Sequence, residues 1–193
     1  KRIAENGEEN RVHQVEGSAE SRGSQRAGCL SIVLSNASTS MKISNDERAR
    51  LVEEIKKERD PDDGTSAYRR FFQRHQCRTK ETPLPLINAF GHTGGVWVGT
   101  DVVADYVASP PLSQEAIERL PPALIVRGEH DFVTEKCTAG WKDIFGMGDH
   151  IKGIKEIVMG DCAHYCHFER PEEYGDVIES FCTEHDYRQA KQV

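Results

Sequence analysis

The sequence predicts an α/β fold built on a parallel sheet, with a helical excursion between the first strand and the second. A short continuous apolar run, residues 123–126, has the composition of a buried strand, because helices cover both faces of a parallel sheet, and residues 154–159 form a second strand-like run. Each run leads into a glycine, and an amphipathic segment over residues 171–184 follows the second. Loops after the carboxyl ends of such strands carry the chemistry of α/β folds, so we expect the functional residues there.

The chain begins with a stretch that is poor in core-forming residues. Residues 1–28 are rich in Glu, Arg, Gly, Ser and Gln and contain almost no large apolar side chain. From composition alone we expect a poorly structured lead-in there. Residues 29–36 then form a short apolar run that ends in small polar residues, which predicts the first strand.

Helices are expected from about residue 40. Ser44, followed three residues later by Glu47, predicts a capping box at the start of a helix that should end near Arg59, before the breaker at residues 60–64. A second helix is expected over residues 66–76, with aromatic side chains that pack against its neighbours. Residues 79–113 are rich in Pro and Gly and predict loops.

These elements predict the domain organisation. The core comprises residues 29–39 and 116–186, a helical cap covers residues 40–115, and residues 187–193 form a tail. The 193 residues suffice for one domain with such an excursion.

The composition disfavours several classes of partner. A net charge of −7 provides no basic surface for nucleic acid or an anionic membrane. No apolar run approaches the length of a membrane span, and no signal peptide opens the chain, so we expect a cytoplasmic protein. The six cysteines are scattered, which is typical of reduced intracellular thiols. The first residue is Lys1 rather than Met, which indicates a processed chain or a fragment.

Asp131 and His164 are the strongest candidates for chemistry. They lie 33 positions apart, and each follows a predicted strand, so they are expected on neighbouring strand-end loops. A hydrolytic triad needs an acid that fixes the tautomer of a histidine, and a histidine that takes a proton from the nucleophile. In α/β-hydrolases the chain order is nucleophile, acid, histidine, and the order of this pair agrees with it.

Five segments resemble the proline iminopeptidases and their amidase relatives. Residues 128–134 are similar to the G-x-x-D-x-x-T segment that carries the acid of that family, and residues 161–164 to the segment that carries its histidine. Residues 168–174 resemble the family segment after the histidine, residues 34–37 the strand before the cap, and residues 65–78 a cap helix. The resemblance covers roughly residues 29–185 and weakens between 91 and 119.

The resemblance implies an α/β-hydrolase-like fold that lacks its leading half, and a serine hydrolase that releases an N-terminal proline or similar residue from a small peptide or amide. In this family the nucleophilic serine lies on a sharp strand-to-helix turn, the nucleophile elbow, with the pattern G-x-S-x-G. Residues 19–23 are close to this pattern, with Ala19 in place of the first glycine. Ser21 would then be the nucleophile, and the backbone N–H of Arg22 one oxyanion donor. Under this resemblance, residues 1–28 would be a damaged nucleophile region instead of a poorly structured lead-in. No cofactor and no metal is implied.

Departures from the family pattern keep other functions open. Only 14 residues separate Ser21 from Asn36, too few for a full helix and the next strand. Residues 91–107 contain no glutamate to bind a substrate amine, which favours an esterase or amidase of the same fold. A truncated, non-catalytic remnant that acts as a binding module is a further alternative. Missing strands would leave sheet edges open, which favours a homo-oligomer.

A zinc site is the last alternative. Cys162, His164, Cys166 and His167 lie within six residues of one another. Structural zinc sites usually combine two such clusters, and no second cluster is present. Cys162 is also a candidate nucleophile, but it comes after the acid in the chain, which is the wrong order for this fold.

Overall fold

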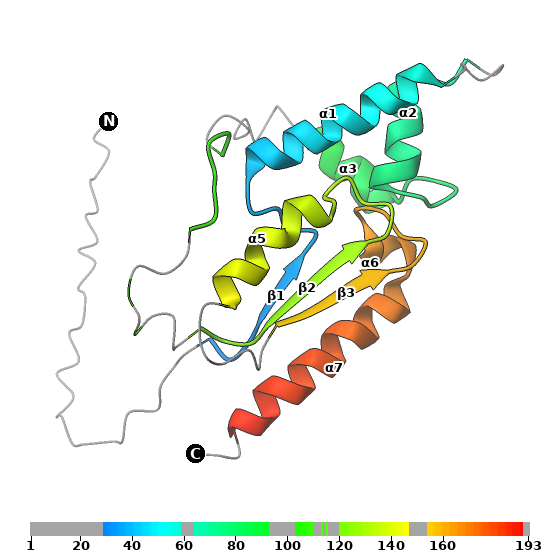
Figure 1. The fold of residues 1–193 in the computed structure, drawn as a ribbon. Helices are drawn as coiled ribbons and strands as arrows, with labels where there is room; N and C mark the ends of the chain where they lie inside the picture. Colours follow the sequence, from blue (N-terminus) through cyan, green and yellow to red (C-terminus); the bar gives the residue numbers. More distant parts are fainter. Residues whose placement is uncertain are drawn as a thin grey trace, which may run out of the picture.

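The computed structural model describes residues 29–58, 64–92, 103–109, 113, 115, 120–146 and 154–190, and the side chains of these residues as far as 185. Its centre is a parallel sheet of three strands in the order β1 (Ile32–Ser35), β2 (Ala123–Gly128) and β3 (Ile154–Met159) (Figure 1). Ile32 pairs with Ala123, and Ala123 pairs with Ile154. The three predicted strands are therefore confirmed as neighbours in one sheet.

Helices cover both faces of this sheet (Figure 1). Helix α5 (Glu135–Phe145) connects β2 to β3 on one face, and α7 (Pro171–Ala190) lies on the other, after the short α6 (Cys166–Glu169). The main core lies between the sheet and α7 and contains Leu124, Val126, Met159, Cys162, Cys166 and Phe181. Because β2 is central and covered on both sides, four of its six residues are fully buried in succession, as its apolar run predicts.

The chain between β1 and β2 forms a helical layer that we call the cap. It contains α1 (Met41–Lys57), α2 (Ala67–Phe71), the π-helix η1 (Phe72–Gln76) and α3 (Leu84–His92). A second core of Val52, Ile55 and Phe71 joins α1 to α2, with Phe132 packed against it from the loop after β2. Phe71 therefore serves packing, as predicted for the aromatic residues of the second helix, whereas Tyr68 is 63% exposed.

The predicted capping box at Ser44 is wrong. Helix α1 begins at Met41 and is capped by Ser40, whose hydroxyl accepts a hydrogen bond from the backbone N–H of Ile43 at 3.4 Å. Ser44 and Glu47 are buried inside the helix instead. Arg50, Thr134 and Lys136 donate to the Glu47 carboxylate; the bond from Arg50 contributes most to lowering its pKa to about 2. Glu47 thus joins α1 to the start of α5.

Two further expectations differ from the structure. Part of the region predicted as loops, residues 79–113, is helical: α3 begins at Leu84, and the carbonyl of Pro83 accepts from the N–H groups of Leu86 and Ile87. Pro85 is compatible with a helix here because the first-turn N–H groups have no partner within the helix. Helix α7 continues to Ala190, into the predicted tail.

No helix in the described ranges is long and apolar enough to cross a membrane. All six cysteines carry free thiols, of which four are buried.

Gly128, at the end of β2, should be the most sensitive glycine of the sheet. A Cβ at this position would overlap the backbone of Cys162 and Ala163, whereas one at Gly175 in α7 would meet nothing within 4 Å. We expect Gly128→Ala to lower the free energy of unfolding by roughly 1–3 kcal/mol through overpacking. The matched control Gly175→Ala should raise it by roughly 0.5–1 kcal/mol. Urea denaturation measures both, and equal effects would contradict the close approach.

Candidate active site

The carboxyl ends of β2 and β3 bring Asp131 and His164 together. The Nδ1 atom of His164 lies 3.0 Å from Oδ1 of Asp131. The Asp131 side chain is fully buried, and that of His164 is 22% exposed. Because an ionised carboxylate only accepts hydrogen bonds, the neutral form of this imidazole would carry its proton on Nδ1 and a free lone pair on Nε2. This geometry is the one predicted for the pair from its position after two successive strands.

Two further groups donate to the Asp131 carboxylate. The backbone N–H of Val133 donates to Oδ1 at 2.8 Å, and the side-chain amide of Asn36 donates to Oδ2 at 2.9 Å. A buried carboxylate needs such donors, since burying an unpaired charge is costly. Together with His164, these groups make three donors to the Asp131 carboxylate, and they fix its orientation toward the imidazole.

Asn36 connects β1 to the pair, and it was not predicted as a site residue from the sequence. It comes directly after β1 and has a φ of 52°, a left-handed conformation that Asn adopts more readily than most residues. The same amide nitrogen that donates to Asp131 also donates to the backbone carbonyl of His164. Asn36 therefore touches both loops. The available signal was an Asn directly after a predicted strand, at the edge where the functional loops meet.

Aromatic rings enclose the imidazole. The Phe132 ring lies 4.4 Å from the His164 ring, centre to centre, and Tyr165 contacts it edge-on at 5.1 Å. Burial raises the pKa of the Tyr165 hydroxyl, so this side chain is neutral near pH 7. The pair thus lies beside neutral, largely apolar groups, where its mutual hydrogen bond is little weakened by water.

The predicted nucleophile and oxyanion donor, Ser21 and Arg22, lie outside the described residues. Within the described ranges, no hydrogen bond reaches Nε2 of His164. The structure therefore brings Asp131 and His164 together, and the catalytic roles of these two residues, of Ser21 and of Arg22 stay predictions.

The cysteines near His164 are arranged as buried thiols. Cys162 and Cys166 are fully buried, and the Cys166 thiol donates to the carbonyl of Ala163 at 3.1 Å. Burial raises the pKa of Cys166 to about 12, which disfavours the thiolate that binds zinc. The Nδ1 atom of His164 is hydrogen-bonded to Asp131. The described residues contain no group of three side chains arranged to hold a metal ion.

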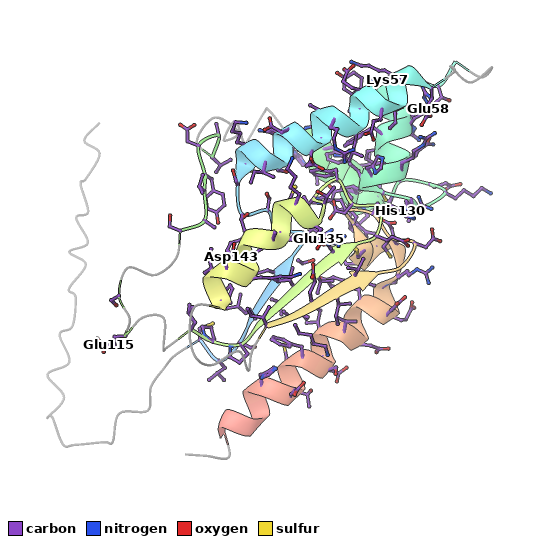
Figure 2. The ribbon with its side chains drawn as sticks, viewed as in Figure 1. Lys57, Glu58, Glu115, His130, Glu135 and Asp143 are labelled. Atoms are coloured by element: carbon purple, nitrogen blue, oxygen red, sulfur yellow. The ribbon has the colours of Figure 1, made fainter. Side chains whose placement is uncertain are left out.

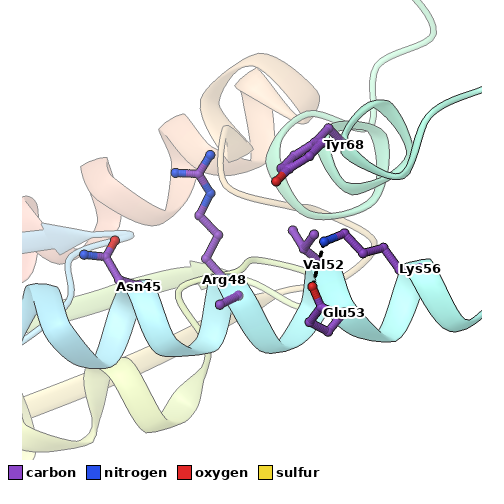
Figure 3. A pocket seen from close by; sticks show the side chains of 7 residues that line it. Asn45, Arg48, Val52, Glu53, Lys56 and Tyr68 are labelled. Carbon is purple, nitrogen blue, oxygen red and sulfur yellow. Dashed lines mark hydrogen bonds and ion pairs between the residues drawn. The ribbon is translucent and has the colours of Figure 1, made fainter.

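Among the described residues of the cap, two surface hollows are formed by α1, α2, η1 and α3 together with the segment over residues 80–82. One, of about 290 Å³, is bordered by α1 and Tyr68 of α2 and is lined by Arg48 and Lys56 among others; Lys56 pairs there with Glu53 (Figure 3). The other, of about 600 Å³, has Phe72 and Phe90 in its wall. Phe90 contacts Tyr165, which contacts His164, so the second hollow is linked to the pair through aromatic rings.

Comparisons with known proteins concern the fold as a whole. No protein-family model and no curated protein matches the sequence. The crystal structure of proline iminopeptidase from Mycobacterium smegmatis is similar, with a TM-score of 0.56 and 26% identity over 86% of this chain and 60% of that one. The crystal structure of VinJ has a TM-score of 0.57 and 22% identity over 83% of this chain and 60% of that one.

The chain therefore spans about 60% of the length of these two solved structures. Together with the parallel sheet, the similarities show that the chain has an α/β-hydrolase fold, of which the described residues form a part. The predicted fold class is confirmed.

Replacing Asn36 should separate its hydrogen bonds from its backbone conformation. Asn36→Gly removes the bonds and keeps a residue suited to positive φ, so we expect a loss of roughly 1–3 kcal/mol in the free energy of unfolding. Asn36→Ala should lose about 1 kcal/mol more, because alanine disfavours φ of 52°. The control Asn45→Ala, at an exposed position of α1, should change stability by less than about 0.5 kcal/mol. Urea denaturation tests this, and an Asn36→Gly variant as stable as wild type would contradict it.

Proposed function

We propose that the protein is a serine hydrolase in which His164 acts as the general base and acid, and Asp131 orients it. The observation that carries the proposal is the Asp131–His164 hydrogen bond of 3.0 Å, made between two loops that come after adjacent parallel strands. The buried carboxylate selects the tautomer of His164 that has a free lone pair on Nε2. That lone pair is the group a serine hydrolase uses to take the proton of its nucleophile.

The proposed reaction passes through a covalent intermediate. The hydroxyl oxygen of Ser21 attacks the substrate carbonyl while Nε2 of His164 takes the hydroxyl proton, and Asp131 stabilises the imidazolium that forms. The backbone N–H of Arg22 donates to the oxyanion. His164 then gives its proton to the leaving amine, which departs as the acyl-enzyme forms. Water, activated in the same way, hydrolyses the acyl-enzyme and restores Ser21.

The substrate we propose is a small peptide or amide with an N-terminal proline or similar residue. The support is the resemblance of residues 128–134 and 161–164 to segments of the proline iminopeptidases, and the similarity to a solved structure that bears that name. The chain spans about 60% of the length of that structure, so the activity is proposed for the whole protein.

One observation favours a second candidate, an esterase or amidase that acts on an uncharged acyl group. Recognition of a free amine needs a carboxylate partner, and residues 91–107 contain no glutamate. The four described glutamates of α1 and its cap residue are each paired with Lys or Arg, so none of these four is an unpaired partner. The pairs are Glu47 with Arg50 and Lys136, Glu53 with Lys56, Glu54 with Arg50, and Glu58 with Arg70 and Arg74.

Labelling with a fluorophosphonate probe, mapped by mass spectrometry, tests the proposed function. We expect the label on Ser21, and no label at that position in Ser21→Ala. The rate of labelling at Ser21 should fall by about 10²–10⁴-fold in His164→Ala, because a general base contributes that much to the rate. The control His92→Ala, at an exposed position in α3, should label at the wild-type rate.

Absence of labelling in protein shown to be folded would overturn the serine mechanism and favour a non-catalytic remnant that acts as a binding module. If the label is found, proline-amide and acyl-ester reporters distinguish the two substrate classes. Faster hydrolysis of the proline amide supports the peptidase, and faster hydrolysis of the ester supports the second candidate.

A further inference from the structure

The end of the π-helix η1 lies against both loops of the candidate site. The backbone carbonyl of His75 accepts from the N–H of Phe132 at 3.4 Å, and the carbonyl of Gln76 accepts from the N–H of Tyr165 at 3.1 Å. Phe132 is the residue directly after Asp131, and Tyr165 is the residue directly after His164. Two consecutive residues of the cap thus bind the chain beside the acid and beside the histidine.

The side chain of His75 adds a third contact. Its Nδ1 atom lies 2.7 Å from the backbone carbonyl of His130, the residue before Asp131. Because a carbonyl only accepts, Nδ1 is the donor. Figure 2 shows His130 where β2 and β3 end, beneath the cap. His75 therefore holds the acid loop on both sides of Asp131, through His130 and through Phe132.

The packing of η1 agrees with this role. The Phe71 ring lies 5.5 Å from the His75 ring and 6.0 Å from the Phe132 ring, and Phe132 lies 4.4 Å from His164. A continuous line of rings therefore connects the cap core to the imidazole. Single turns of π-helix occur frequently at functional sites, because the wider turn redirects backbone and side-chain groups.

We propose that His75 is a positioning residue that, together with the carbonyl of Gln76, holds the Asp131 and His164 loops in the geometry the reaction needs. We call these three hydrogen bonds the cap clasp. The inference rests on the proposed function for its effect on rate, but the clasp itself is a structural claim. It makes the site dependent on the position of the cap, since moving η1 away breaks contacts to both loops together.

Two variants of His75 separate the hydrogen bond from packing. His75→Asn keeps a side-chain N–H donor near the position of Nδ1 and loses the ring, whereas His75→Phe keeps the ring against Phe71 and loses the donor. The first readout is amide hydrogen exchange at Phe132 and Tyr165, with β2 and β3 as internal controls. The second is the fluorophosphonate reaction, separated into the affinity for the probe and the maximal labelling rate.

If the clasp positions the pair, the maximal labelling rate of His75→Phe falls by about 10–100-fold with unchanged probe affinity, since small displacements of catalytic groups cost this much. Its Phe132 and Tyr165 amides exchange faster, while the strand amides keep their protection. His75→Asn stays within a few-fold of wild type in both readouts. The proposal would be overturned if His75→Phe labelled and exchanged like wild type. It would also be overturned if His75→Asn lost as much labelling rate and amide protection as His75→Phe.

The wild-type protein gives a test that needs no variant to fold. The clasp predicts slow exchange of the Phe132 and Tyr165 amides, and fast exchange there beside protected strands would overturn it. Exchange also separates the two proposals. If the wild-type protein shows this protection but no labelling, the result supports the clasp and contradicts the serine mechanism.

Discussion

The buried carboxylate of Asp131 is the constraint on which the arrangement of the site depends. Its charge must be matched by donors, and these come from the ends of all three strands: Asn36 after β1, Val133 after β2 and His164 after β3. The parallel arrangement of the strands makes this convergence possible, because their carboxyl ends meet at one edge of the sheet. The sheet and the site therefore support each other.

Much of the core was predictable because its signals are local. The run at β2 is apolar over most of its length, because a parallel strand buried on both faces requires that pattern. Strand β3 is only partly buried, and its run includes Lys155 and Glu156. Their order and the polar residues after them then sufficed to predict the Asp131–His164 pair. The cap was harder, because Ser40 and Ser44 are both followed by helical sequence. The hydrogen bond from the N–H of Met41 to the carbonyl of Tyr106, distant in the chain, favours the earlier start.

Asn36 and His75 were not predicted as site residues for a different reason. Each acts through contacts with residues far away in the sequence, 95 positions for Asn36 with Asp131 and 55 for His75 with His130. No composition or spacing rule encodes such contacts. Both residues lie outside any triad motif, yet they connect the first strand and the cap to the pair. The site is thus a joint product of core and cap.

The tautomer of His164 in the wild-type protein tests the central claim most directly, because it reports the Asp131 contact without requiring substrate or nucleophile. Nitrogen-15 NMR of the imidazole, assigned with His164→Ala, distinguishes the two ring nitrogens. For the neutral form of the imidazole we predict a proton on Nδ1 that is protected from exchange with water, and a change of tautomer in Asp131→Asn. A proton on Nε2, or a freely exchanging ring unaffected by Asp131→Asn, would contradict this claim.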